Sequence, residues 1–157
     1  MISPRLSNLR SLIRDENVSV FWLPNHENSG QPGTRYLSGF TGSDSHLLIT
    51  KSKNYLVTDS RYLVAARKEA SGCIISDVGK RSFVEVLKNV LPQSGRRNVL
   101  IDGSVVPYSS NEKIKKAIPH LTITNEDGLL KELRRVKDTA ETTLLKKLYR
   151  KVAEGMF

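Results

Sequence analysis

The sequence of 157 residues has one cysteine, one tryptophan and no long apolar run. Cys73 cannot form a disulfide within the chain, which fits a reducing, cytoplasmic location. Two isoleucines follow it in a predicted strand, which favours a buried and unreactive thiol. No apolar run approaches the ~20 residues of a membrane-spanning helix, and the N-terminus lacks the apolar stretch and cleavage site of a signal peptide. We therefore predict a cytoplasmic protein with no membrane partner.

Residues that hold metals are also few and scattered. His26, His46 and His120 lie far apart in the sequence, so they form no cluster with metal-ligand spacing. His46 sits beside leucines in a predicted strand, which favours a packed histidine over a ligand. Asp59 and Asp102 come near strand ends, but two carboxylates make a weak case for a metal-dependent nuclease. We predict no catalytic residue and no metal ligand in this chain.

Positive charge is in excess, since 25 Lys and Arg residues against 16 Asp and Glu give a formal net charge of +9. The basic residues are spread along the chain, without a tract of like charges and without interleaved aromatic residues. We expect most of them on solvated helix faces, which argues against nucleic acid as a partner. A binding module for a polyanion such as nucleic acid stays open as the alternative function.

The N-terminal third predicts a helix, a strand and a loop. Ser3 caps and Pro4 begins a helix, with an apolar stripe on one side and Arg5, Arg10 and Arg14 facing water. A β-branched and aromatic run over 18–23 predicts a buried strand that Pro24 ends. Two prolines and two glycines over 24–34 indicate an exposed loop without regular structure.

The rest of the chain alternates between strands and helices. A hairpin is expected first, and the order that follows is typical of an α/β domain with a mixed β-sheet flanked by helices. The expected strands are 46–50, 55–58, 73–78, 99–102 and 121–124, and the expected helices are 61–70, 82–90, 110–117, 129–136 and one that begins after a capping box at 138–141.

Four segments resemble a known family in their order and spacing. They are Tyr-Leu-Ser-Gly-Phe-Thr-Gly at 36–42, Leu-Leu-Ile-Thr at 47–50, Tyr-Leu-Val-Thr-Asp-Ser-Arg-Tyr at 55–62 and Leu-Arg-Arg-Val-Lys-Asp-Thr-Ala-Glu at 133–141. Together they resemble the N-terminal domain of the creatinase/prolidase family, which includes Xaa-Pro dipeptidases and Xaa-Pro aminopeptidases.

The resemblance implies a mixed sheet with a ribonuclease H-like motif in residues 1–128, and a linker with the start of a helix in residues 129–157. That helix would lead into a catalytic domain beyond this sequence, where two Asp, one His and two Glu hold two divalent metal ions (Mn, Co or Zn). The implied partners are that catalytic domain, a second subunit and a proline-containing peptide. The chain alone would be inert, whereas the intact enzyme would hydrolyse the bond before proline. The sequence leaves open whether that enzyme is a dipeptidase, an aminopeptidase or a member with another substrate.

Nine residues follow from the resemblance and from their local setting. Candidates for a substrate pocket or an interface are His26, Arg35, Tyr36, Arg61 and Tyr62. Candidates for a structural turn are Gly39, Phe40, Gly42 and Asp59. Glycine suits a turn that needs positive φ or close backbone approach, and Asp59 or Ser60 could cap the next helix. A purely structural role for Asp59, Arg61 and Tyr62, as cap, ion pair and packing, also stays open.

Overall fold

The computed structural model describes residues 2–13, 17–26 and 31–155. Its strands are β1 (Val20–Asn25), β2 (Ser45–Ile49), β3 (Asn54–Thr58), β4 (Ile74–Asp77), β5 (Asn98–Ile101) and β6 (Thr122–Asn125). Its helices are α1 (Ile2–Leu12), α2 (Gln31–Ser38), α3 (Leu63–Glu69), α4 (Phe83–Val90), α5 (Tyr108–Ala117), α6 (Leu129–Arg135) and α7 (Thr139–Ala153).

The strands form one mixed sheet in the order β4-β3-β2-β1-β5-β6. Strand β2 runs antiparallel to both of its neighbours, and the other pairings are parallel. The carboxyl ends of β1, β3, β4, β5 and β6 therefore meet at one edge of the sheet, where β2 begins. Because each strand leads into a connection at this edge, polar side chains from distant parts of the sequence gather there.

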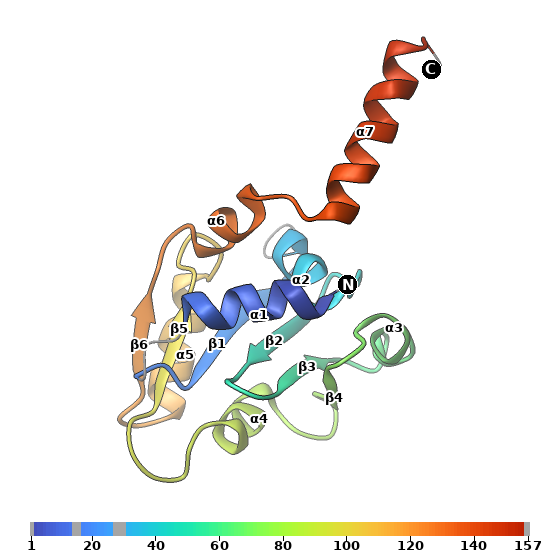
Figure 1. The fold of residues 1–157 in the computed structure, drawn as a ribbon. Coiled ribbons are helices and arrows are strands. Elements are labelled where there is room, and N and C mark those ends of the chain that lie inside the picture. The colour runs from blue at the N-terminus through green and yellow to red at the C-terminus, as the bar shows by residue number, and fades with distance from the viewer. Residues whose placement is uncertain (1, 14–16, 27–30, 156–157) are drawn as a thin grey trace.

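Helices cover both faces of the sheet (Figure 1). Side chains alternate along β1: Phe21 and Leu23 point to the layer with α1, α2, α3 and α6, whereas Val20 and Trp22 point to the layer with α4 and α5. The predicted mixed sheet flanked by helices is confirmed. Helix α7 extends away from this body (Figure 1) and has no buried residue.

The segment 24–34 was predicted to lack regular structure, and that prediction is wrong. Strand β1 continues through Pro24 to Asn25, because the parallel ladder to β5 ends at Phe21 and leaves Pro24 unpaired on that side. Helix α2 then begins at Gln31, with Pro32 in its first turn, where a proline removes no helical hydrogen bond. A Cβ atom at Gly33 would lie 2.8 Å from Leu130 Cδ1, so this glycine allows helix packing and is not a turn residue. Residues 27–30 of the predicted loop lie outside the described part of the chain.

The first helix also differs in detail from the prediction. It begins at Ile2, so Ser3 lies inside the helix and not at the predicted cap position. Arg5 and Arg10 do not simply face water: Arg5 pairs with Asp138, and Arg10 donates to the Thr50 carbonyl at 2.9 Å. Arg14 lies outside the described residues. The hairpin and the later elements are confirmed, with shifts of a few residues at their ends.

Helix α6 receives its cap from the sheet. Gly128 precedes it with φ 82° and offers no side chain, so the first N–H groups of the helix need another acceptor. The Asp102 carboxylate, at the end of β5, accepts from Gly128 N at 3.1 Å and from Leu130 N at 3.0 Å. This contact fixes α6 against the core, where Leu129, Leu130 and Leu133 are buried.

In the part of the chain that the structure covers, no helix has the length and apolar character needed to cross a bilayer.

Candidate functional site

A corner of the sheet edge brings together His26 and Arg61, two of the predicted site residues. His26 follows β1, Asp44 precedes β2, and Asp59 and Arg61 follow β3. Asp44 lies between the two bases: its Oδ1 is 3.4 Å from His26 Nδ1 and its Oδ2 is 3.8 Å from Arg61 Nη2. The antiparallel pairing of β1 with β2 and of β2 with β3 makes these three segments neighbours.

Arg61 is held in place by Asp59 while most of its side chain stays in solvent. Its Nη2 lies 2.7 Å from Asp59 Oδ2, and its backbone N donates to Asp59 Oδ1 at 2.9 Å. The side-chain hydrogen bond from Arg61 holds the pKa of the Asp59 carboxyl below its ordinary value. Neither Asp59 nor Ser60 caps α3, since the cap position is Tyr62 and has no side-chain cap bond. The Arg61 side chain is 66% exposed, so its guanidinium can donate to a carboxylate or carbonyl brought to this corner.

A small hollow of about 230 Å³ lies at the same corner, lined by His26, Asp44, His46, Asp59 and neighbouring strand residues. His46 forms its inner wall and stacks on Phe83 with ring centroids 3.9 Å apart. Burial, with a smaller effect of His26, lowers the pKa of His46 to about 3. A neutral His46 accepts from Trp22 Nε1 at 3.3 Å, so it is a packed histidine, as the sequence indicates.

Tyr62 joins the corner to the turn at 39–42. Its hydroxyl lies 2.8 Å from the Ser43 hydroxyl, and its ring meets Phe40 edge-on at 6.0 Å between centroids. Gly39 has a φ of 83°, in the left-handed region that favours glycine. A Cβ at Gly42 would come within 2.8 Å of Tyr62 Cδ1 and would also meet the Phe40 ring. The turn is therefore fixed by packing of these two rings over a backbone with no room for a side chain.

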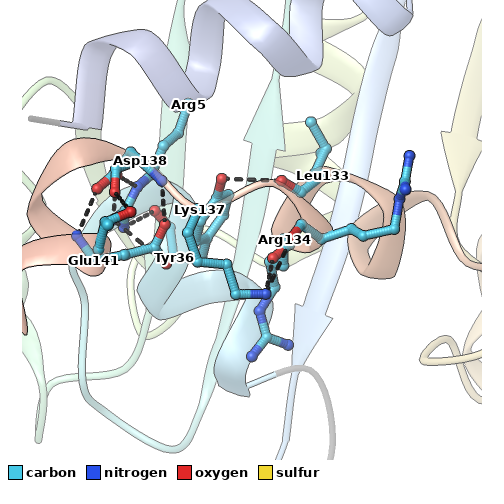
Figure 2. A network of polar contacts seen from close by, with 9 residues as sticks. Arg5, Tyr36, Leu133, Arg134, Lys137, Asp138 and Glu141 are labelled. Carbon is cyan, nitrogen blue, oxygen red and sulfur yellow. Dashed lines mark hydrogen bonds and ion pairs between the residues drawn. The ribbon is translucent and has the colours of Figure 1, made fainter. Parts of the chain in front are cut away.

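Arg35 and Tyr36 lie elsewhere, on α2, near the start of α7. Figure 2 shows a network around Tyr36: the Arg5 guanidinium lies over its ring, 4.3 Å from the centroid, and its hydroxyl donates to the Leu133 carbonyl at 3.1 Å. Arg5 also donates to Asp138 Oδ2 at 2.6 Å. Asp138 is the N-cap of α7 and forms the predicted capping box with Glu141, which is confirmed. We name Arg5, Tyr36, Leu133, Asp138 and Glu141 the α7 hub.

The predicted site residues thus divide between two places. The corner holds His26, Arg61 and Tyr62, and the α7 hub holds Tyr36, with Arg35 beside it. Sequence reasoning missed Asp44 and Arg5, which are the partners that organise the two places. Asp44 belongs to no recognised element or motif and Arg5 was expected on a solvated helix face, so neither carried a signal in the sequence beyond its charge.

No group of three or more His, Cys, Asp or Glu side chains is arranged to hold a metal ion among the described residues. Cys73 is a free thiol that is half-buried and not fully buried as the sequence favoured, and its burial raises its pKa to about 11. A thiol with such a pKa is almost fully protonated at neutral pH and is a poor nucleophile.

Comparison with known proteins gives the family. The model of the Creatinase/Prolidase N-terminal domain matches residues 5–136. The chain belongs to this family. A probable Xaa-Pro aminopeptidase P of Pyrenophora teres f. teres is 32% identical over 124 residues, which cover 73% of this chain and 19% of the relative.

Solved structures agree with the family match. The X-Pro aminopeptidase from Thermotoga maritima is 32% identical with a TM-score of 0.77, over 88% of this chain and 38% of that chain. The Xaa-Pro dipeptidase from Bacillus anthracis is 28% identical with a TM-score of 0.78, over 94% and 39%. A cytosolic X-prolyl aminopeptidase from Caenorhabditis elegans, described with a di-nuclear active site, shares the fold at 21% identity and a TM-score of 0.68, over 84% and 25%. The creatinase/prolidase-type domain seen here spans about a fifth of the length of the curated relatives that it matches.

Proposed function

We propose that this chain is the non-catalytic N-terminal domain of an Xaa-Pro peptidase. In the intact enzyme it would support dimer formation and line or gate the substrate pocket. The observation that carries the proposal is the family match over residues 5–136 in a chain that spans a fifth of its Xaa-Pro aminopeptidase relatives. The substrate class is a peptide with proline in the second position, as the names of those relatives indicate. The cytosolic C. elegans relative supports a cytoplasmic location.

Helix α7 supports the role of residues 129–157 as the link to a catalytic domain. The family match ends at residue 136, just before the Asp138 cap. Helix α6 packs on the core, whereas α7 exposes one apolar stripe, made of Leu144, Leu145, Leu148, Tyr149 and Val152, each between 40% and 72% exposed. Exposed apolar patches of this kind mark interaction surfaces. In the proposal, the catalytic domain covers this stripe and contributes the two divalent metal ions (Mn, Co or Zn).

The geometry of His26, Asp44, Asp59 and Arg61 at the sheet edge supports the proposed role of the domain in lining the substrate pocket. Arg61 presents an exposed guanidinium whose orientation Asp59 fixes, and His26 presents a partly exposed imidazole beside Asp44. Groups fixed in this way can bind a peptide carboxylate or carbonyl at little entropic cost. The pocket they face would be that of the same subunit or of its dimer partner.

A chimeric enzyme tests the proposal. Residues 1–157 would replace the matching part of the Thermotoga maritima X-Pro aminopeptidase, and kcat/KM would be measured with an Xaa-Pro peptide and Mn²⁺. We expect an active chimera, no hydrolysis by residues 1–157 alone, and a loss of about tenfold or more in kcat/KM for His26→Ala or Arg61→Ala.

Asp77→Asn is the matched control, because Asp77 lies at the same sheet edge at the end of β4 and outside the hollow. An active chimera that is indifferent to both corner substitutions would refute the pocket-lining role. Hydrolysis by residues 1–157 alone would refute the non-catalytic assignment.

A further inference from the structure

A groove runs between α2, α6 and the first turn of α7. It consists of two adjoining hollows, of about 760 Å³ and about 600 Å³, and Pro32, Arg134 and Glu141 line both of them. Gly33 and Leu130, which pack closely on one another, both line the larger hollow. Hollows of this size are large enough for a ligand or a short peptide segment.

The carboxylates on the groove wall all have partners of their own. Asp102 accepts hydrogen bonds from Ser104, Gly128 and Leu130. Glu132 pairs with Arg135 at 2.7 Å. Glu141 accepts from Asp138 N at 3.0 Å and lies 3.7 Å from Arg5 Nη2. None of these carboxylates is left to neutralise a further base in the groove.

Four basic side chains of the groove lack a carboxylate partner in the described part of the chain, and one of them, Lys137, donates to the backbone carbonyls of Arg134 and Arg135. Arg35, Lys131 and Arg134 are exposed and have no carboxylate within 4.0 Å among the residues that the structure describes. Glu69, which feels the charge of Arg35, accepts hydrogen bonds from Thr41. The groove therefore has a surplus of positive charge, and a concave surface with charge of one sign concentrates ligands of the opposite sign.

We propose that this groove binds an acidic peptide segment, whose carboxylates pair with Arg35, Lys131 and Arg134. Guanidinium groups bind carboxylates with two parallel hydrogen bonds, and the apolar side chains of Pro32, Val105 and Leu130 offer contacts for the residues between them. Nucleic acid fits less well, because single strands need exposed aromatic rings for stacking. The described lining has one ring, Tyr36, which is 7% exposed and covered by Arg5. This inference does not rest on the proposed peptidase role.

A peptide titration of the whole chain tests the inference. The probe is a short glutamate-rich peptide, and its counterpart has glutamine at each glutamate position. We expect amide chemical-shift changes confined to α2, α6 and the first turn of α7, and no binding of the glutamine peptide. Affinity is expected to fall severalfold between about 50 mM and about 300 mM salt, since the pairs are near the surface.

Single substitutions locate the contacts. Arg35→Ala and Arg134→Ala should each weaken binding by about threefold to tenfold, while Lys116→Ala, an exposed base of α5, should leave it unchanged. Both arginines are exposed, so the variants should fold, and their amide spectra check this. The proposal would be overturned by an equal loss of peptide affinity with Lys116→Ala, or by amide chemical-shift changes spread over α5 and α7. It would also be overturned if the glutamate-rich peptide did not bind, or if a single-stranded oligonucleotide bound more tightly.

Discussion

Asp102 offers the sharpest test of how the domain is held together. The side chain is 1% exposed, and its carboxylate accepts from the Ser104 hydroxyl at 2.5 Å, from Gly128 N at 3.1 Å and from Leu130 N at 3.0 Å. Burial alone would raise the pKa of Asp102, but these hydrogen bonds outweigh burial and hold its pKa below the ordinary value. One carboxylate thus joins the end of β5 to the start of α6.

Asp102→Asn keeps the size of the side chain and removes one acceptor. In either orientation of the amide, an NH₂ group faces N–H donors, the buried one of Leu130 on one side or the partly buried ones of Gly128 and Ser104 on the other. A lost hydrogen bond to a charged group costs about 1.5–3 kcal/mol, and an unsatisfied buried donor costs about 1–3 kcal/mol. These costs overlap, so we expect the free energy of unfolding to fall by about 2–4 kcal/mol. That is a large part of the ~5–15 kcal/mol of an ordinary domain.

Urea denaturation at pH 7 measures this loss, with Asp77→Asn as the control. The Asp77 carboxylate accepts a hydrogen bond in an exposed turn, from Gly79 N at 2.8 Å, so losing the charge there should cost about 0.5 kcal/mol or less. Because the folded pKa of Asp102 is depressed, its contribution is complete above the unfolded pKa of ~3.9 and is lost as the pH falls through the folded pKa. The difference between wild type and Asp102→Asn should therefore stay constant from pH 7 to about pH 5 and shrink as the pH falls below about 4. A loss below about 1 kcal/mol at pH 7, or a difference that grows in acid, would refute the reasoning.

Three further predictions concern other parts of the domain. Burial lowers the pKa of His46 to about 3 in the folded state, so below about pH 6.5 the unfolded chain binds one more proton than the folded chain. The free energy of unfolding should therefore fall by up to ~1.4 kcal/mol for each pH unit of acidification below about pH 6.5. In urea titrations at several pH values, His46→Phe should remove this contribution of His46 to the pH dependence. Cys73, with a pKa of about 11, should react with a disulfide reagent at pH 8 about a hundredfold more slowly in the native protein than in urea, and equal rates would contradict its burial. Gly39→Ala forces a side chain into a backbone with φ 83°, so the free energy of unfolding should fall by about 1–2 kcal/mol, measured by urea denaturation.

The sequence was sufficient for the fold class and for most elements, because the hydrophobic patterns of strands and helices are local. It failed at 24–34, where local rules for proline and glycine conflict with the tertiary setting. Gly33 has a packing role that depends on Leu130, almost a hundred residues later, and Pro24 is tolerated because of where the ladder to β5 ends. Neither condition is visible in a window of ten residues.

The candidate site was harder to predict for the same reason. Residues in recognised motifs, such as Arg61 and Tyr36, were found, whereas Asp44 beside Arg61 and Arg5 over Tyr36 were not. Arg5 and Asp138 are 133 positions apart, and no periodic pattern links an arginine in the first helix to the cap of the last one. Long-range ion pairs depend on the finished packing of several elements, so they are the part of a site that local patterns leave undetermined.

The α7 hub holds the last helix at one end only, among the contacts of the described residues. Helix α7 has 15 residues and is therefore about 22 Å long, and among the described contacts its base is fixed through Asp138 and Glu141 to Arg5, with no buried residue further along. A rotation of roughly 10° at the hub would move the far end by about 4 Å, which is close to the diameter of a methyl group. Small changes in the geometry of one arginine on α1 are thus amplified into displacements large enough to realign whatever the helix carries.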